Sequence, residues 1–184
     1  SDVLRALPVL VARIRDAGGA ITHLRTDLGG EFTGRNVEPT LALLGVSLTF
    51  VTPELHVNRA EAAHKLANHA MRANLAMASD LLHFWMYARA HGVAAHNALV
   101  TSRHNDVPTR VLTGQLPSIQ SMMPWGSQIA VLVFPTPTSS DCRAVLATYL
   151  GPAAKCGTRA IYYTTDNIHV AHSSTYRFLA SPAN

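Results

Sequence analysis

The first hundred residues alternate between helical and strand-like patterns, and this order limits the fold more than any other feature. Residues 20–26 and 46–51 are typical of strands, and the helical segment 37–44 between them is ended by Gly45. An earlier helix is predicted by apolar residues at helical spacing: Leu4, Leu7, Val11 and Ile14. Two strands joined by a helix run parallel in one sheet. The sequence therefore predicts an α/β fold.

Two carboxylates fall at notable places in this pattern. Asp27 follows the first strand in the segment Thr26-Asp27-Leu28-Gly29-Gly30-Glu31-Phe32, where a turn would hold it at the end of the sheet. Glu61 lies near the start of a helix that begins at about Asn58. Because hard cations prefer oxygen ligands, such a pair forms part of the divalent-metal sites of polynucleotidyl-transfer enzymes. A complete site needs a third carboxylate.

These residues belong to a longer series of sequence landmarks. The first are Leu24-Arg25-Thr26-Asp27-Leu28-Gly29-Gly30-Glu31-Phe32, Leu44-Gly45-Val46, Thr52-Pro53-Glu54-Leu55 and Ala60-Glu61. The next are Phe84-Trp85, Ala88, Asn97, Pro108, Leu112-Thr113-Gly114 and Pro117. The last are Trp125-Gly126, Tyr149-Leu150-Gly151 and Tyr176-Arg177-Phe178. In this order and spacing, the chain resembles the integrases of copia-type (Ty1/copia) retrotransposons, from the second half of the catalytic core through the small β domain that follows.

The resemblance implies both a fold and a site. It implies a partial ribonuclease-H-like integrase core over 1–100, a connector over 101–124 and a small all-β, SH3-like barrel module over 125–184. It further implies that Asp27 and Glu61 are catalytic, Mg²⁺-binding residues of an enzyme that joins DNA ends. The partners of such a protein would include nucleic acid.

The chain also departs from the family pattern. The family's first catalytic Asp and its zinc-binding segment are absent, and Asp2 and Asp16 fall in or beside the first helix. The spacing from Asp27 to Glu61 is slightly shorter than the family's, and Asn58-Arg59-Ala60 stands where a flexible Asn-Gly pair is usual. We therefore expect no catalysis from the chain as it stands, and Mg²⁺ binding only if a third carboxylate is supplied.

The helix that begins near residue 58 has two separate faces. Apolar residues share one face: Ala63, Leu66, Ala67, Ala70, Ala73 and Met77. Polar residues share the other: Glu61, Lys65, Asn68 and Arg72. The resemblance implies that Lys65, Asn68 and Arg72 bind nucleic acid. The alternative is a solvated face with a Glu61–Lys65 ion pair worth about 0.2–0.5 kcal/mol.

The second half of the chain changes from helix to strand. Residues 81–99 predict an apolar helix with Leu81, Trp85 and Ala88 on one stripe, and we expect Phe84 and Trp85 in its core. Short strands follow at 128–134, 143–150, 159–164, 168–172 and 175–179, with Asp166-Asn167 as a hairpin turn. Short strands at this spacing predict a small barrel or curled sheet.

Composition sets further limits. The formal charge of +4 permits contact with phosphate. Charged residues make up only 14% of the chain, against about 25% in usual soluble domains. Either partners cover part of the surface, or an Ala-rich genome explains the bias. No apolar run approaches the ~20 residues that span a bilayer.

Cysteine and histidine give no metal motif. Cys142 and Cys156 lack CxxC spacing, which fits a reduced intracellular compartment. The pairs His64/His69 and His91/His96 are five residues apart, not the four of a helical zinc site. Because the chain begins at Ser1, we expect a processed protein or a piece of a longer one, and a mitochondrial home would fit the former.

One strand edge is predicted to be incomplete. In a ribonuclease-H-like sheet, the strand around Ile21 to Leu24 would pair with a first strand that this chain lacks. Because an unpaired apolar edge promotes aggregation, we expect an upstream segment or a protein partner to complete it by β-augmentation.

Two functions follow as hypotheses. The first is a catalytically incomplete, integrase-derived subunit that binds nucleic acid or builds a larger assembly, such as a ribonucleoprotein. The alternative is a fragment of an active retrotransposon integrase that carries out Mg²⁺-dependent DNA strand transfer.

Overall fold

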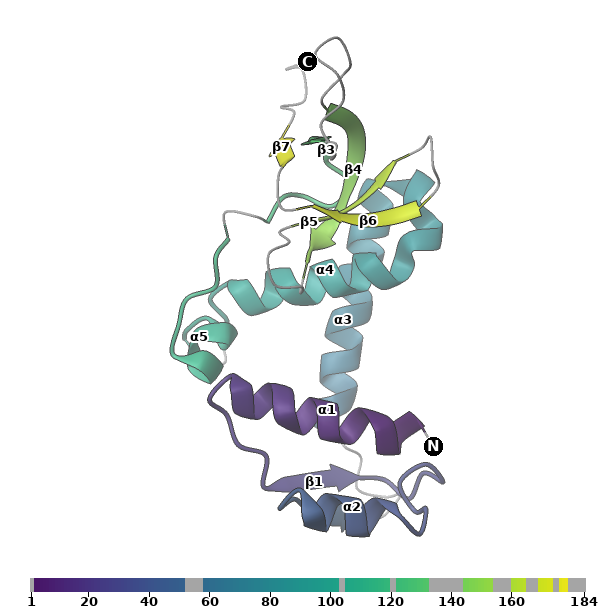
Figure 1. Ribbon diagram of the computed structural model, residues 1–184, viewed down its shortest axis with the longest axis vertical. Coiled ribbons are helices and arrows are strands. Elements are labelled where there is room, and N and C mark those ends of the chain that lie inside the picture. Colours follow the sequence, from purple (N-terminus) through teal and green to yellow (C-terminus); the bar gives the residue numbers. More distant parts are fainter. Residues whose placement is uncertain are drawn as a thin grey trace. The chain divides into compact units, whose positions relative to one another are not determined.

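The computed structural model describes residues 2–51, 58–102, 105–119, 122–132, 144–153, 160–164, 169–173 and 176–178. The chain forms two compact units. Unit 1 comprises Ser1–His64 and Pro108–Gln115, and unit 2 comprises Lys65–Val107 and Leu116–Asn184. Both units contain helices, and β strands lie in each, so the chain is mixed α/β (Figure 1).

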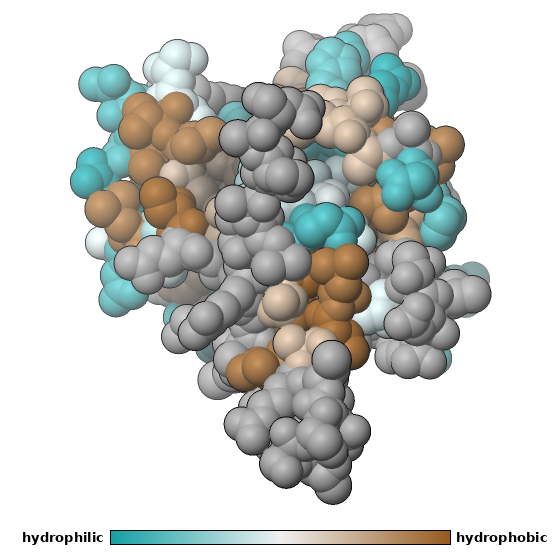
Figure 2. All heavy atoms as spheres, turned by 90° about the horizontal axis from the view of Figure 1, so that it is seen from above, coloured by the Kyte–Doolittle hydropathy of each residue, from teal (hydrophilic) through white to brown (hydrophobic). Residues whose placement is uncertain are grey.

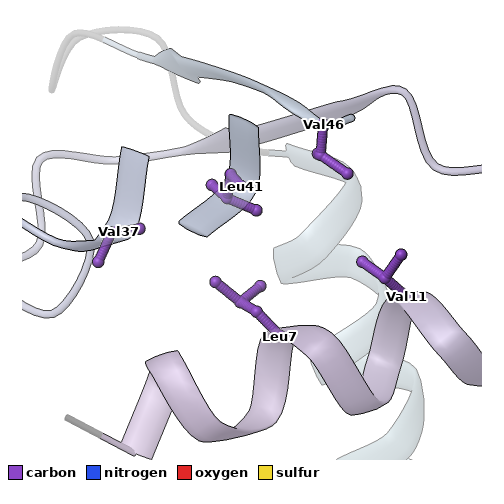
Figure 3. Close-up of a cluster of buried hydrophobic side chains, with 5 residues drawn as sticks. All are labelled: Leu7, Val11, Val37, Leu41 and Val46. Atoms are coloured by element: carbon purple, nitrogen blue, oxygen red, sulfur yellow. The ribbon is translucent and has the colours of Figure 1, made fainter. Parts of the chain in front are cut away.

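The described residues of unit 1 form three helices and two strands. They are α1 (Asp2–Asp16), β1 (His23–Thr26), α2 (Val37–Leu43), β2 (Ser47–Phe50) and α5 (Pro108–Thr113), with the first turns of α3 (Asn58–Met77). Leu7 and Val11 of α1 are buried against Leu41 of α2 and Val46 (Figure 3). The helical spacing of the apolar residues in α1 thus produces the packed face that the sequence predicts.

The β1–α2–β2 segment forms the predicted parallel unit. β1 pairs with β2 in parallel, with His23 opposite Ser47 and Thr26 opposite Phe50. Gly45 ends α2 with φ of +69°. Its N–H donates to Ala42 O at 3.0 Å, and the Val46 N–H donates to Leu41 O at 2.9 Å. This bond pattern is a Schellman motif, and the contact between Val46 and Leu41 is its usual hydrophobic partner.

The sheet of unit 1 is small in the part of the chain that the structure describes. It contains β1 and β2 alone. Leu24 and Leu48 pack on the core, whereas His23 and Arg25 are exposed. Parallel sheets in proteins normally have more strands and both faces covered. None of the described strands pairs with the edge of β1 that faces away from β2, so this edge is open among them.

Unit 2 begins with a helix pair. α3 is followed by the 3₁₀ turn η1 (Ser79–Phe84) and α4 (Trp85–Ala98). The buried face of α3 differs from the predicted one: Ala67 is buried and Asn74 half-buried, whereas Met77 is 69% exposed and Leu66 43% exposed. The polar Asn74 lies within the packed face because it bonds to α4, a contact that hydrophobic patterning does not predict.

Trp85 does not lie in the core, so that prediction is wrong. Its side chain is 50% exposed, although Leu81 and Ala88 on the predicted stripe are buried. Those two residues pack instead with Trp125 and Leu150, which occupy the core position beside them. Phe84 is half-buried against the same cluster.

The strands of unit 2 form an antiparallel five-stranded sheet in the order β6-β5-β4-β3-β7. They are β3 (Gln128–Leu132), β4 (Ala144–Pro152), β5 (Ala160–Thr164), β6 (His169–Ser173) and β7 (Tyr176–Phe178). The register shifts between Tyr149 and Gly151, where Gly151 has φ of +133°. Tyr149, Leu150 and Gly151 are all buried. Because successive strand residues face opposite sides of a sheet, Tyr149 joins the cluster of Ile129 while Leu150 joins the cluster of Trp125. Among the described residues the hydrogen bonding does not join β6 to β7, and the SH3-like barrel stays a prediction.

The compact units divide the chain elsewhere than at the predicted ranges 1–100, 101–124 and 125–184. The division falls inside α3, because the helices from residue 65 onward pack with Trp125 and Leu150. The predicted irregular connector contains α5, which belongs to unit 1. The Asp166-Asn167 turn, the segment 52–57 and both cysteines lie outside the described residues.

Apolar side chains reach the surface of both units. Brown apolar atoms lie beside hydrophilic ones in Figure 2. Large apolar residues that are at least half exposed include Val9, Leu43, Trp85, Met86 and Leu146. The sequence contains few charged residues, and apolar side chains accordingly form part of the described surface. None of the described helices has the length and apolar character needed to cross a bilayer.

Candidate functional site

Asp27 lies directly after the last residue of β1, at the position that the sequence predicts. Its side chain is exposed. The Oδ1 atom accepts a hydrogen bond from the Gly29 N–H at 3.2 Å and another from the Thr26 hydroxyl at 3.4 Å. The bond from Gly29 forms an Asx turn, and both contacts orient the carboxylate at the end of the strand.

Two carboxyl groups lie beside Gly29. A Cβ atom on Gly29 would lie 3.1 Å from Asp27 Oδ1 and 3.8 Å from Glu31 Cδ. The Asp27 and Glu31 side chains therefore both lie beside Gly29, a placement that reasoning from the sequence did not assign to Glu31. The signal was present, since both residues lie in the same short turn segment.

Glu61 lies in the first turn of α3, where its side chain is exposed and has an interaction partner. Asp27 and Glu61 belong to the same compact unit. Segment 52–57 between them lies outside the described residues, and the convergence of the two carboxylates stays a prediction. Within the described part of the chain, no three His, Cys, Asp or Glu side chains are grouped so that they could hold a metal ion.

The three predicted nucleic-acid contacts lie on the unit 2 part of α3. Lys65 and Arg72 are exposed, and Asn68 is half-buried. Their spacing puts them on one side of the helix, because residues three to four apart are neighbours on its surface. Ala67 lies on the opposite side and is buried. The basic side chains thus point away from the packed face of α3.

A buried polar cluster forms a second feature of unit 2. The Asn74 amide nitrogen donates to Ala88 O at 2.8 Å and lies 3.3 Å from His91 Nδ1. His91 Nε2 lies 2.9 Å from Met123 O. His91 itself is 7% exposed. Sequence reasoning considered His91 only as a metal ligand and did not consider Asn74, because the partners are distant along the chain.

Aromatic rings enclose the His91 imidazole. The ring centroids of Trp125 and Tyr149 lie 5.9 Å and 5.8 Å from that of His91, and Tyr149 meets it edge-on. Burial lowers the pKa of His91 below its usual 6.5, and the Met123 carbonyl partly opposes that shift. The indole N–H of Trp125 is buried without an acceptor among the described residues. His91 is thus a neutral core residue near pH 7.

Comparison with known proteins gives only a weak structural likeness. No family model and no curated protein matches the chain. One similar solved structure is the simian T-cell lymphotropic virus intasome in complex with the PP2A regulatory subunit B56 gamma. The match is 15% identical with a TM-score of 0.48, and it covers 97% of this chain and 65% of that chain.

Proposed function

We propose that the chain is an integrase-derived protein that binds nucleic acid through α3 and does not by itself complete a strand-transfer site. The observation that carries the proposal is the placement of Lys65 and Arg72. Both are exposed, about two turns apart on the side of α3 that faces away from the buried Ala67. Exposed Lys and Arg side chains on one helix face can contact the phosphates of a nucleic-acid backbone.

Each side chain in this stripe has a distinct role in the proposal. The Arg72 guanidinium can bind a phosphate through two N–H groups, whereas the Lys65 ammonium acts as a point charge. Asn68 between them offers an amide for hydrogen bonding. Because such contacts go to the backbone and not to the bases, binding would depend on salt and hardly on sequence.

The alternative is a fragment of an active integrase. It is favoured by the exposed Asp27 carboxylate, which the Gly29 N–H and the Thr26 hydroxyl orient at the strand end. Asp27 and Glu61 would hold Mg²⁺ together with a third carboxylate from elsewhere, and the bound metal would polarise the reacting phosphate. The chain's own residues would only bind and orient in that reaction.

The open edge of β1 supports a role in an assembly. A strand from an upstream segment or a partner would extend the two-stranded sheet along the Ile21–Leu24 side, and backbone hydrogen bonds would hold it. This part of the proposal predicts that the isolated chain self-associates. A stable, monomeric 184-residue protein in sedimentation experiments would count against it.

The test of nucleic-acid binding compares two charge-matched double variants. Lys65→Gln/Arg72→Gln removes the stripe, and Arg5→Gln/Arg13→Gln removes two exposed arginines of α1. Fluorescence anisotropy with labelled duplex DNA would be recorded over a range of salt concentrations. The α3 variant should lose affinity and reduce the slope of log K against log salt by about 1.8, because each phosphate contact contributes about 0.9. Equal losses in both variants would refute a specific role of α3.

A further inference from the structure

His91 lies where three parts of unit 2 meet. It extends from α4 and contacts Asn74 of α3, the Met123 carbonyl before β3, and Tyr149 of β4. Gly151 of β4 also lies against His91, since a Cβ atom there would be 3.4 Å from the His91 Cβ. One imidazole ring therefore links the helix pair to the sheet.

The hydrogen bonds fix the tautomer of this ring. The Asn74 nitrogen must be the donor to Ala88 O, which sets the orientation of the amide. The same nitrogen faces His91 Nδ1, so Nδ1 has to accept. The proton then sits on Nε2, from which it is donated to Met123 O. The neutral ring satisfies both of its nitrogens in this arrangement.

A protonated ring would not fit the same arrangement. Nδ1 would carry a hydrogen directed at the Asn74 NH₂ group, which is itself a donor. The groups that face the ring are the neutral Asn74 amide, the Met123 carbonyl and the Trp125 and Tyr149 side chains. None of these groups is a carboxylate that could pair with a protonated ring. Arg89, two residues before His91 on α4, has only hydrogen-bond donors and offers no acceptor to a protonated ring.

We propose that His91 is a pH-sensitive contact between the sheet of unit 2 and the helices α3 and α4. The neutral ring holds the sheet against the helices, and protonation of the ring releases it. The lowered pKa of the buried ring agrees with this geometry. Because the folded-state pKa lies below 6.5, the stabilisation is complete above pH 6.5 and is lost as the pH falls through the folded value. Mild acidification would thus loosen the sheet without any ligand.

Trp125 provides a local probe for this release. The chain has two tryptophans, and the exposed one is removed by Trp85→Phe. In this background, Trp125 emission should shift to longer wavelength as the pH falls from about 8 to about 5. Adding His91→Gln should abolish the pH dependence. Adding His69→Gln, which changes an exposed histidine of α3, should leave it intact. An unchanged emission over this range, or the same transition with His91→Gln, would overturn the proposal.

A second measurement needs no substitution of His91. Long-range ¹H–¹⁵N spectra of the full chain report which imidazole nitrogen carries the proton. Near pH 7.5, His91 should be neutral with its proton on Nε2. A proton on Nδ1 alone, or a doubly protonated ring at that pH, would overturn the proposal even if the His91→Gln variant failed to fold.

Discussion

Gly92 of α4 lies directly against Ala70 of α3, and a Cβ atom on Gly92 would come 2.5 Å from the Ala70 Cβ. Two helices can approach this closely only where one of them lacks a side chain. The same approach allows Asn74 to reach Ala88 O at 2.8 Å. The close contact of α3 and α4 is thus a condition for the buried polar cluster around His91.

Gly92→Ala should destabilise the protein despite a better helix propensity. Alanine gains about 1 kcal/mol over glycine inside a helix, but an overpacked contact typically costs about 1–3 kcal/mol. We expect a net loss of roughly 1 kcal/mol in the free energy of unfolding, measured by urea denaturation. Ala90→Gly, at an exposed position of the same helix, calibrates the propensity alone. A Gly92→Ala variant more stable than the parent would show that the helices are not in close contact.

Asn74→Ala should lower the free energy of unfolding, because it removes the buried amide that bonds to Ala88 O and faces His91 Nδ1. The substitution leaves His91 Nδ1 without its donor, and an unsatisfied buried polar group costs about 1–3 kcal/mol. The matched control is Asn36→Ala, since the Asn36 side chain makes no capping hydrogen bond to α2. Thermal unfolding would compare the two variants. Equal shifts in Tm would indicate that the Asn74 bridge contributes nothing.

The elements of unit 1 could be predicted from the sequence because they depend on local signals. The spacing of Leu7 and Val11 gave the packed face of α1, and Gly45 marked the end of α2 through its positive φ. Asp27 was expected directly after a strand and lies there. Each of these inferences uses residues within a few positions of one another, where helix and turn geometry alone decide the outcome.

The polar core of unit 2 could not be predicted in the same way. Asn74, His91 and Met123 meet only through tertiary packing. Trp85 was misplaced because Trp125, from a distant part of the sequence, takes the core position beside Ala88. The pairing of Asp27 with Glu61 depends likewise on distant contacts and stays a prediction.

The chain alone should not join DNA ends. Asp27 and Glu61 by themselves are fewer carboxylates than the metal site of this chemistry needs, so we predict that a Mg²⁺-dependent strand-transfer assay with preprocessed DNA ends gives no joined product. Asp27→Asn should leave DNA affinity unchanged or slightly increased, because it removes a negative charge. Joined product that disappears with Asp27→Asn would favour the alternative function.

The proposed contact between nucleic acid and α3 is tested most directly by ultraviolet cross-linking followed by mass spectrometry. Duplex and single-stranded oligonucleotides would be cross-linked to the full chain, and the modified peptides would be sequenced. We predict cross-links within Asn58–Met77, concentrated around Lys65 and Arg72. Cross-links that occur only outside α3, or a yield no higher than that of a non-binding protein, would contradict an integrase-derived nucleic-acid-binding role.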